Sequence, residues 1–418
     1  MREIKRPKYL NQLILGRQNG LIKIITGIRR CGKSYLLFNI FHNYLISHGV
    51  EKNHIIEIAF DDLLNEEYKN PHKLLSYVKS RMHDKKLYYI LLDEVQMMED
   101  FVAALNSLLH LRNADVYVTG SNSKFLSTDI ATEFRGRGDE IRVHPLSFSE
   151  FFSVHKGDKN DAWKNYLTYG GFPLVLSLNS EQKKMSYLRN LYGTVYKKDL
   201  VERNHIKKVE EFDKLTKIIA SSIGSPCNPN KLSNTFKSVE HADLNSETIG
   251  IYLSYLQEAF LIEKSLRFDI KGKKYIGTIP KYYFTDTGLR NALLDFRQQE
   301  ETHLMENILY NELSIRDFIV DIGMVEVRTS SKEMGSKRNQ YEVDFVANMG
   351  SKRYYIQSAL NISDPEKMSQ ETFSLNHIPD SFKKIIIVKD DISPWHNERG
   401  ILILSLFDFL LNPDSLDL

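Results

Sequence analysis

The chain has 418 residues, a length expected to divide into about two to four domains. Hydrophobic residues make up 42% and charged residues 26%, which excludes a disordered or collagen-like chain. The 56 lysines and arginines nearly balance 54 aspartates and glutamates, so any surface that attracts nucleic acid must be local. Two cysteines, Cys31 and Cys227, are too few for a disulfide framework or a structural zinc site. Because we find no apolar run typical of a signal peptide or a membrane-spanning helix, we predict a soluble, cytoplasmic protein.

A glycine-rich segment between a strand and a helix is the strongest motif. The β-branched run at 21–26 predicts a strand, and apolar residues at helical spacing in 34–43 predict a helix. Residues 27–34 have the spacing G-x-x-x-x-G-K-S of a phosphate-binding loop, in which backbone N–H groups face phosphates. In such a loop Lys33 binds the β- and γ-phosphates and Ser34 binds Mg²⁺. The residues predicted to bind nucleotide are Gly27, Ile28, Arg29, Arg30, Cys31, Gly32, Lys33, Ser34 and Tyr35.

A second motif is an unbroken apolar run that ends in two carboxylates. Residues 87–94, LYYILLDE, are typical of a central parallel strand buried on both faces. In this interpretation Asp93 holds Mg²⁺ through water, and Glu94 is the general base that activates the attacking water. The alternative is a strand followed by the acidic N-terminus of a helix, where carboxylates suit the helix dipole.

Polar residues follow the next predicted strand, at 115–120. Ser121, Asn122 and Ser123 come at its carboxyl end, the edge of a parallel sheet that faces ligands. Asn122 or Ser121 is therefore a candidate to orient the attacking water or to sense the γ-phosphate. The alternative is capping of the following helix.

The glycine-punctuated segment 132–142 offers Arg135 and Arg137. An arginine delivered to the transferring phosphoryl group, from the same chain or from a neighbouring subunit, accelerates hydrolysis by about a thousandfold or more. An arginine supplied by a neighbouring subunit requires at least a dimer. The alternative for each arginine is a solvated basic turn.

Five segments in this order, GIRRCGKS, LLDEVQ, VTGSNS, FRGR and HPLSFSEFF, resemble a large prokaryotic family of AAA-type P-loop ATPases whose C-terminal half is a domain of unknown function. YLTYGGFP at 166–173 and YEVDFVA at 341–347 resemble later landmarks of that family. The resemblance implies an α/β fold in four parts. These are an AAA-like parallel-sheet core at 1–145, a helical lid at 146–205, a winged-helix-like domain at 206–295 and a restriction-endonuclease-like domain at 296–418.

The segment 261–286 predicts a β-hairpin with its turn near 271–273, after a capped helix at 246–260. From Lys264 to Lys281 there are six basic residues against one acidic residue, Asp269. Such a hairpin could contact the phosphate backbone of DNA, with strong dependence on salt. A solvated turn is the alternative.

The C-terminal part contains acidic residues that restriction-type nucleases would arrange around Mg²⁺. Glu306 and Glu312 fall on a helical stretch, Glu326 and Asp344 in strand-like segments. Gln357 and Ala359 stand where such enzymes place a glutamate and a lysine, so we do not expect nuclease activity. The sequence shows no internal repeat or low-complexity tract, and the segment that comes nearest to a disordered loop is 329–340.

The leading hypothesis is therefore a Mg²⁺-dependent ATPase that couples ATP hydrolysis to movement of its lid and C-terminal domains. The alternative is an ATP-gated switch that binds DNA or a protein, with slow turnover. A third hypothesis, motivated by Asp344, is an ATP-regulated nuclease. A homo-oligomer or a protein partner is compatible with each.

Overall fold

The computed structural model describes residues 3–120, 136–239, 242, 244–275, 279–331, 335–362 and 364–418, with the backbone alone at 195, 328–331 and 335–337. The chain forms two compact units. Unit 1 comprises Met1–Leu146, Phe172–Ser177 and Glu258–Phe260, and unit 2 comprises Ser147–Gly171, Leu178–Gln257 and Leu261–Leu418. The finer division into four domains stays a prediction.

Unit 1 is built on a five-stranded parallel sheet with the strand order β2-β3-β4-β1-β5. Its strands are β1 (Ile22–Thr26), β2 (Ile55–Ala59), β3 (Tyr88–Asp93), β4 (Ala114–Thr119) and β5 (Gly138–Arg142). The strands predicted at 21–26, 87–94 and 115–120 are confirmed to within one residue at each end. β4 lies between the strand that precedes the glycine-rich loop and the strand that ends in Asp93, because Val118 pairs with both Ile24 and Leu92.

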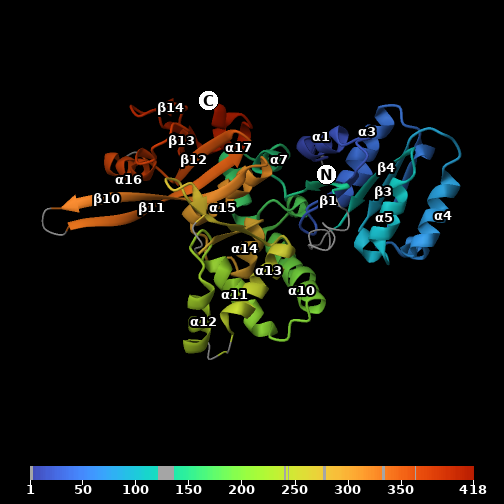
Figure 1. Cartoon of the computed structure of the whole chain (residues 1–418), viewed down its shortest axis with the longest axis horizontal. Helices are drawn as coiled ribbons and strands as arrows, with labels where there is room; N and C mark the ends of the chain where they lie inside the picture. Colours follow the sequence, from blue (N-terminus) through green and yellow to red (C-terminus); the bar gives the residue numbers. More distant parts are fainter. Residues whose placement is uncertain are drawn as a thin grey trace. The chain divides into compact units, whose positions relative to one another are not determined.

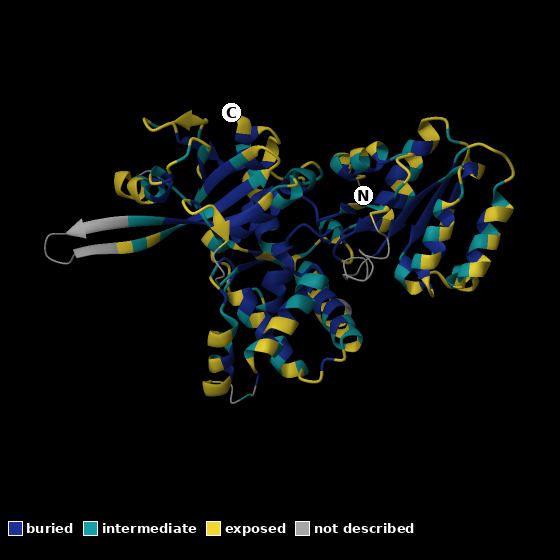
Figure 2. Ribbon diagram, viewed as in Figure 1, coloured by how far each residue is buried: buried dark blue, intermediate teal, exposed yellow. Residues whose placement is uncertain are grey.

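Helices cover both faces of this sheet (Figure 2). On one face, Ile24 and Leu92 join a core with residues of α4 and α5, such as Leu74 and Leu105. On the other face, Phe41 packs on Tyr117 with ring centroids 4.6 Å apart. Both faces of the sheet are covered, so β1 and β3 are buried at every position and are largely apolar. The helical segments are α1 (Pro7–Leu15), α2 (Lys33–Tyr35), a π-helical stretch (Leu36–Phe41), α3 (His42–Ser47), α4 (Pro71–Arg81) and α5 (Phe101–Leu109).

The first part of unit 2 is helical. A hydrogen-bonded junction joins the end of α8 to α14: Thr287 Oγ1 donates to the Tyr166 carbonyl (3.1 Å), and Asn291 Nδ2 donates to the Leu167 carbonyl (3.0 Å). The buried Asp286 carboxylate accepts the Gly171 N–H (2.7 Å) in the YGGFP segment. The helices are α7 (Phe148–Phe152), α8 (Lys159–Tyr169), α9 (Glu181–Asn190), α10 (Lys198–Arg203), α11 (Val209–Ser221), α12 (Pro229–Ser238), α13 (Ser246–Glu258) and α14 (Thr287–Leu293).

An eight-stranded mixed sheet forms the rest of unit 2, with the order β14-β15-β13-β12-β11-β10-β7-β8 (Figure 1). Its apolar core lies between the strands and α16, where Val343 and Ile386 pack with Leu375. The strands are β7 (Arg267–Asp269), β8 (Lys274–Tyr275), β10 (Ile319–Ser331), β11 (Gly335–Met349), β12 (Lys352–Ala359), β13 (Lys383–Val388), β14 (Trp395–His396) and β15 (Leu402–Ser405). The helices around it are α15 (Glu301–Ile315), α16 (Pro365–Asn376) and α17 (Leu406–Leu411).

The predicted basic hairpin is present as two antiparallel pairs. β7 pairs with β8, and β6 (Ile262–Ser265) pairs with β9 (Lys281–Phe284). The prediction that Lys281 can reach DNA is wrong, because this residue is 3% exposed. Its ammonium lies 3.2 Å from Glu306 Oε1 and 2.5 Å from Glu342 Oε1, and these carboxylates raise its pKa although burial alone would lower it.

The prediction of a disordered loop at 329–340 is also wrong. β10 extends to Ser331 and β11 begins at Gly335, so the described residues of this segment are paired strand. Few apolar residues mark it as strand, and its pairing partner is the other arm of the same hairpin. None of the helices in the described ranges is both long and apolar enough to cross a membrane.

Candidate nucleotide-binding site

The loop between β1 and α2 has a backbone that only glycine can adopt at its first position. Gly27 has a φ of 135°, and a Cβ atom built on it would lie 2.0 Å from the Val143 carbonyl oxygen. Gly32 has a φ of 104°, and Arg30 also lies in the left-handed region. The loop therefore curls tightly over the chain that follows β5, as the phosphate-binding motif predicts.

We expect Gly27→Ala to destabilise unit 1 by about 3 kcal/mol and to abolish nucleotide binding, since the new methyl group collides with backbone. Gly20→Ala is the matched control. Gly20 also has a positive φ (75°) but no heavy atom within 4 Å of a built Cβ, so its cost should be about 1 kcal/mol. Urea unfolding and nucleotide titration of both variants test this. Equal effects at the two glycines would contradict the close packing of the loop.

The ammonium group of Lys33 lies under the curled loop. Lys33 is 4% exposed, and its Nζ donates to the carbonyl oxygens of Gly27 (2.9 Å) and Ile28 (3.2 Å). These carbonyls hold a positive charge at the concave side of the glycine-rich turn, where a phosphate group would sit. Of the other loop residues predicted to bind nucleotide, Ile28 and Cys31 are buried, whereas Arg29, Arg30, Ser34 and Tyr35 are exposed.

The structure brings the two main motifs together. The Asp93 carboxylate, at the end of β3, accepts a hydrogen bond from the hydroxyl of Thr119, at the end of β4, and interacts with the hydroxyl of Ser34. Burial raises the pKa of Asp93, and the two hydroxyl hydrogen bonds oppose that shift. Two segments about 60 residues apart in sequence thus form one polar site at the carboxyl edge of the sheet.

The donor set fits magnesium held together with a nucleotide. No group of three or more His, Cys, Asp or Glu side chains suited to a metal exists among the residues that the structure describes. Mg²⁺ in phosphate-transfer sites is commonly bound by one or two protein oxygens, with waters and substrate phosphates completing its shell. The hydroxyl of Ser34 and the carboxylate of Asp93, which interact with one another, provide such oxygens.

Glu94 follows Asp93 with its backbone in the left-handed region, at a φ of 54°. Its N–H donates to Thr119 Oγ1 (3.1 Å), and its carboxylate accepts a hydrogen bond from the Gln96 side chain. A non-glycine residue in this conformation is strained by about 1–3 kcal/mol, and such strain is common at functional sites. Thr119 therefore anchors both carboxylate residues, although the sequence reasoning selected only the polar residues after it.

Of the remaining candidates, only Arg137 lies in the described chain. Arg137 is exposed, directly before β5, and its carbonyl accepts the N–H of Ile22 (2.9 Å). Asn122 and Arg135 lie outside the described residues, so their roles stay predictions.

Sequence reasoning did not find the N-terminal contribution to the loop. Arg6 is 5% exposed, and its guanidinium donates to the Cys31 carbonyl (3.1 Å) and the His144 carbonyl (2.8 Å). It also lies over the ring of Tyr9, whose hydroxyl accepts the His144 N–H (3.2 Å). Arg6 thus ties the loop to the segment after β5. No local pattern marks one basic residue of the N-terminal segment KRPK as part of a loop 25 residues away.

His144 gives this region a predicted dependence on pH. Burial lowers its pKa well below 6.5, and the nearby charges of Arg142, Lys8 and Arg6 lower it further. Above about pH 6.5 the imidazole is neutral in both the folded and the unfolded chain, so the full free energy of unfolding is present. As the pH falls below that value, the unfolded chain takes up a proton that the folded chain does not, and the free energy of unfolding decreases. At pH 5.5 the loss should be about 1.4 kcal/mol.

We expect the stability difference between wild type and His144→Gln to shrink by that amount between pH 7.5 and 5.5, as measured by urea unfolding. A difference that does not change with pH would show that His144 is not held neutral.

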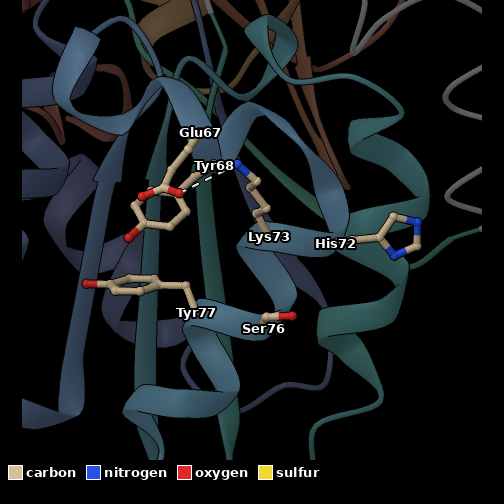
Figure 3. Close-up of a pocket in the computed structure, with 6 residues that line it drawn as sticks. All are labelled: Glu67, Tyr68, His72, Lys73, Ser76 and Tyr77. Carbon is tan, nitrogen blue, oxygen red and sulfur yellow. Dashed lines mark ion pairs between the residues drawn. The ribbon is translucent and has the colours of Figure 1, made fainter.

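A separate shallow pocket of about 330 Å³ lies between the turn at Leu63–Lys69 and α4 (Figure 3). The rings of Tyr68 and Tyr77 pack side by side in it, with centroids 4.5 Å apart, and Lys73 pairs with Glu67 at 3.7 Å. None of the residues predicted to bind nucleotide lines this pocket.

Comparison with known proteins agrees with the class that these motifs define. Residues 19–152 match the AAA domain, and residues 160–300 match a domain of unknown function, DUF8612. The chain thus carries a parallel-sheet P-loop core of the AAA type. It is 32% identical over 414 residues to an uncharacterized protein of Haemophilus influenzae, covering 98% of both chains. The chain belongs to the same protein family as this relative.

Two further similarities extend beyond the bacterial relative. A Methanocaldococcus jannaschii protein, Uncharacterized protein MJ1544, is 28% identical over 360 residues, with 83% of this chain and 76% of that protein covered. A solved structure of the Walker-type ATPase PABY2304 of Pyrococcus abyssi aligns with 70% of this chain and 96% of its own, at 16% identity and a TM-score of 0.49.

Proposed function

We propose that this protein is a Mg²⁺-dependent ATPase that couples ATP hydrolysis to movement of its domains. The observation that carries the proposal is the interaction of the Asp93 carboxylate with the hydroxyl of Ser34, the residue that follows Lys33 in the glycine-rich motif. Phosphate-binding loop, cation-binding hydroxyl and acidic strand end are the parts that P-loop ATPases use together. Here they meet at one edge of one sheet.

The proposed roles follow from these positions. Backbone N–H groups of the loop and the Lys33 ammonium bind the phosphates of ATP, while Ser34 and Asp93 hold magnesium, which neutralises charge on the transferring phosphoryl group. Glu94 accepts a proton from the attacking water. Gln96, which already donates to Glu94, keeps this carboxylate in place.

For Asn122, Arg135 and Arg137 we retain the proposals made from sequence. Asn122 orients the attacking water or senses the γ-phosphate, and Arg135 or Arg137 stabilises the developing charge in its own site or in that of a neighbouring subunit. The exposure of Arg137 supports delivery to a site other than its own, as in a homo-oligomer.

Release of phosphate by wild type, Lys33→Ala and Glu94→Gln tests the proposal. We expect turnover by the wild type alone. If all three release phosphate at the same rate, hydrolysis is assigned to the wrong site.

A second candidate is an ATP-gated switch that binds DNA or a protein, with turnover slow. Exposed Lys264, Lys271, Lys273 and Lys274 favour the DNA version, although Lys281 does not contribute to it. Titration of duplex DNA with and without ATP distinguishes the two candidates, because only the switch requires an affinity that changes with nucleotide.

We also propose a winged-helix-like arrangement for 206–295 and a restriction-endonuclease-like fold, without nuclease activity, for 296–418. The helices α11, α12 and α13, followed by the β6–β9 pair, support the winged-helix-like arrangement.

For the restriction-endonuclease-like fold, the evidence is a pair of acidic residues. Glu306 on α15 and Asp344 on β11 lie near one another, and burial, together with the Glu306 charge, raises the pKa of Asp344. Lys281 pairs with Glu306 of this cluster, and Gln357 and Ala359 lie on β12, which favours a structural role. Glu312 pairs with Arg316 instead (2.9 Å).

A further inference from the structure

Strands β10 and β11 continue past the rest of their sheet as a two-stranded ribbon (Figure 1). Their pairing runs from Ile319 opposite Asn348 to Ser331 opposite Gly335. β7 pairs with β10 only at 322–324, and β12 pairs with β11 only at 345–349. From 326 to 331 and from 335 to 340, each strand therefore pairs with the other alone, over a length of about 20 Å.

The ribbon concentrates positive charge. The two segments 326–331 and 335–340 hold three basic residues, Arg328, Lys337 and Arg338, against one acidic residue, Glu326, which gives a net charge of +2. The whole chain of 418 residues has the same net charge. The field around this ribbon is therefore far more positive than the molecular average.

The register places two of these charges directly opposite each other. Arg328 pairs with Arg338, and in an antiparallel ladder opposite residues share a face. Like charges in this arrangement destabilise a sheet unless an anion lies between them. The Glu326 carboxylate lies 3.6 Å from Arg338, and the Arg338 side chain is 62% exposed. The same face carries Gln340 opposite Glu326.

The β7–β8 turn adds positive charge at the base of the ribbon. β7 runs parallel to β10, and Ile270 N–H donates to the Met324 carbonyl (3.1 Å), just before the ribbon begins. Lys271, Lys273 and Lys274 are exposed in this turn and at its end. Asp269 accepts the N–H groups of Lys271 (3.1 Å) and Gly272 (2.9 Å), which fixes the turn.

We propose that the ribbon and the β7–β8 turn together form a binding surface for duplex DNA. The major groove of B-form DNA is about 12 Å wide and admits a two-stranded ribbon, whereas the major groove of an RNA duplex is too narrow. Arginine and glutamine are side chains that read base edges in that groove, and lysines of the turn contact the phosphates alongside. This surface does not depend on ATP hydrolysis, so its test needs no nucleotide.

Fluorescence anisotropy with a labelled DNA duplex of about three helical turns tests the proposal at two salt concentrations. Arg328→Glu with Arg338→Glu, and separately Lys271→Glu with Lys273→Glu, should each weaken binding by at least about tenfold and reduce its salt dependence. Lys183→Glu with Lys207→Glu is the control, because both residues are exposed in unit 2, outside this surface, and the change in charge is the same. The control should bind like the wild type.

Circular dichroism and thermal unfolding of each variant establish that it is folded. An unlabelled RNA duplex should compete less well than the unlabelled DNA duplex. The proposal is overturned if the wild type does not bind DNA at low salt, if the control loses as much affinity as the ribbon variants, or if polyglutamate binds the ribbon and DNA does not. The last result would assign the surface to an acidic protein.

Discussion

Lys33→Ala is expected to lower the rate of ATP hydrolysis by about a hundredfold or more and to weaken ATP binding. Lys33 Nζ is the buried cation at the concave side of the loop, held by two loop carbonyls. Alanine removes the charge that would face the β- and γ-phosphates, while Gly27 and Gly32 keep the backbone curled. Steady-state phosphate release and nucleotide titration measure the two effects.

Lys73→Ala is the matched control for this prediction. Lys73 belongs to the same unit but is exposed, and it pairs only loosely with Glu67 (3.7 Å). Its loss should leave hydrolysis and binding close to wild type. A Lys33 variant that is folded and still hydrolyses ATP at the wild-type rate would remove the loop from the proposed reaction.

Glu94→Gln should separate binding from hydrolysis. The substitution keeps the shape of the side chain but removes the base, so hydrolysis should fall by about a hundredfold or more, while ATP binding persists. Asp93, Ser34 and Lys33 are unchanged in this variant, and they are the residues assigned to the nucleotide and its magnesium. Single-turnover phosphate release and equilibrium titration of the same sample make the comparison.

Glu99→Gln controls for the loss of an acidic group near the end of β3. Glu99 is exposed, and the same substitution there should leave the rate unchanged. If Glu94→Gln loses binding in proportion to rate, then Glu94 holds the site together and is not the base. A rate unchanged by either substitution would mean that another group activates the water.

The central strands and the loop were predictable because their signals are local. A short and largely apolar run identifies β1 and β3 when both faces of the sheet are covered, and the glycines of the loop indicate a backbone that other residues avoid. The order of motifs along the chain then implied that Ser34 and Asp93 would meet. Parallel strands place their carboxyl ends at one edge, which is why motifs on separate segments can be expected to lie close together.

The predictions that failed concern residues whose surroundings are set by long-range contacts. The burial of Lys281 depends on Glu306 and Glu342, which follow it by 25 and 61 residues, so a basic residue in a basic segment gave no sign of it. Arg6 contacts the loop only through tertiary structure. The ribbon strands at 326–331 and 335–340 show no alternation of apolar and polar residues, and their pairing is visible only in the structure.

Calorimetric titration of the purified protein with ATP, with and without magnesium, tests the assembled site most directly. The proximity of Ser34 and Asp93 to the glycine-rich loop predicts saturable uptake of ATP that magnesium strengthens. Absence of any heat of binding, or an affinity that magnesium leaves unchanged, would contradict the assignment of this edge of the sheet as the nucleotide site.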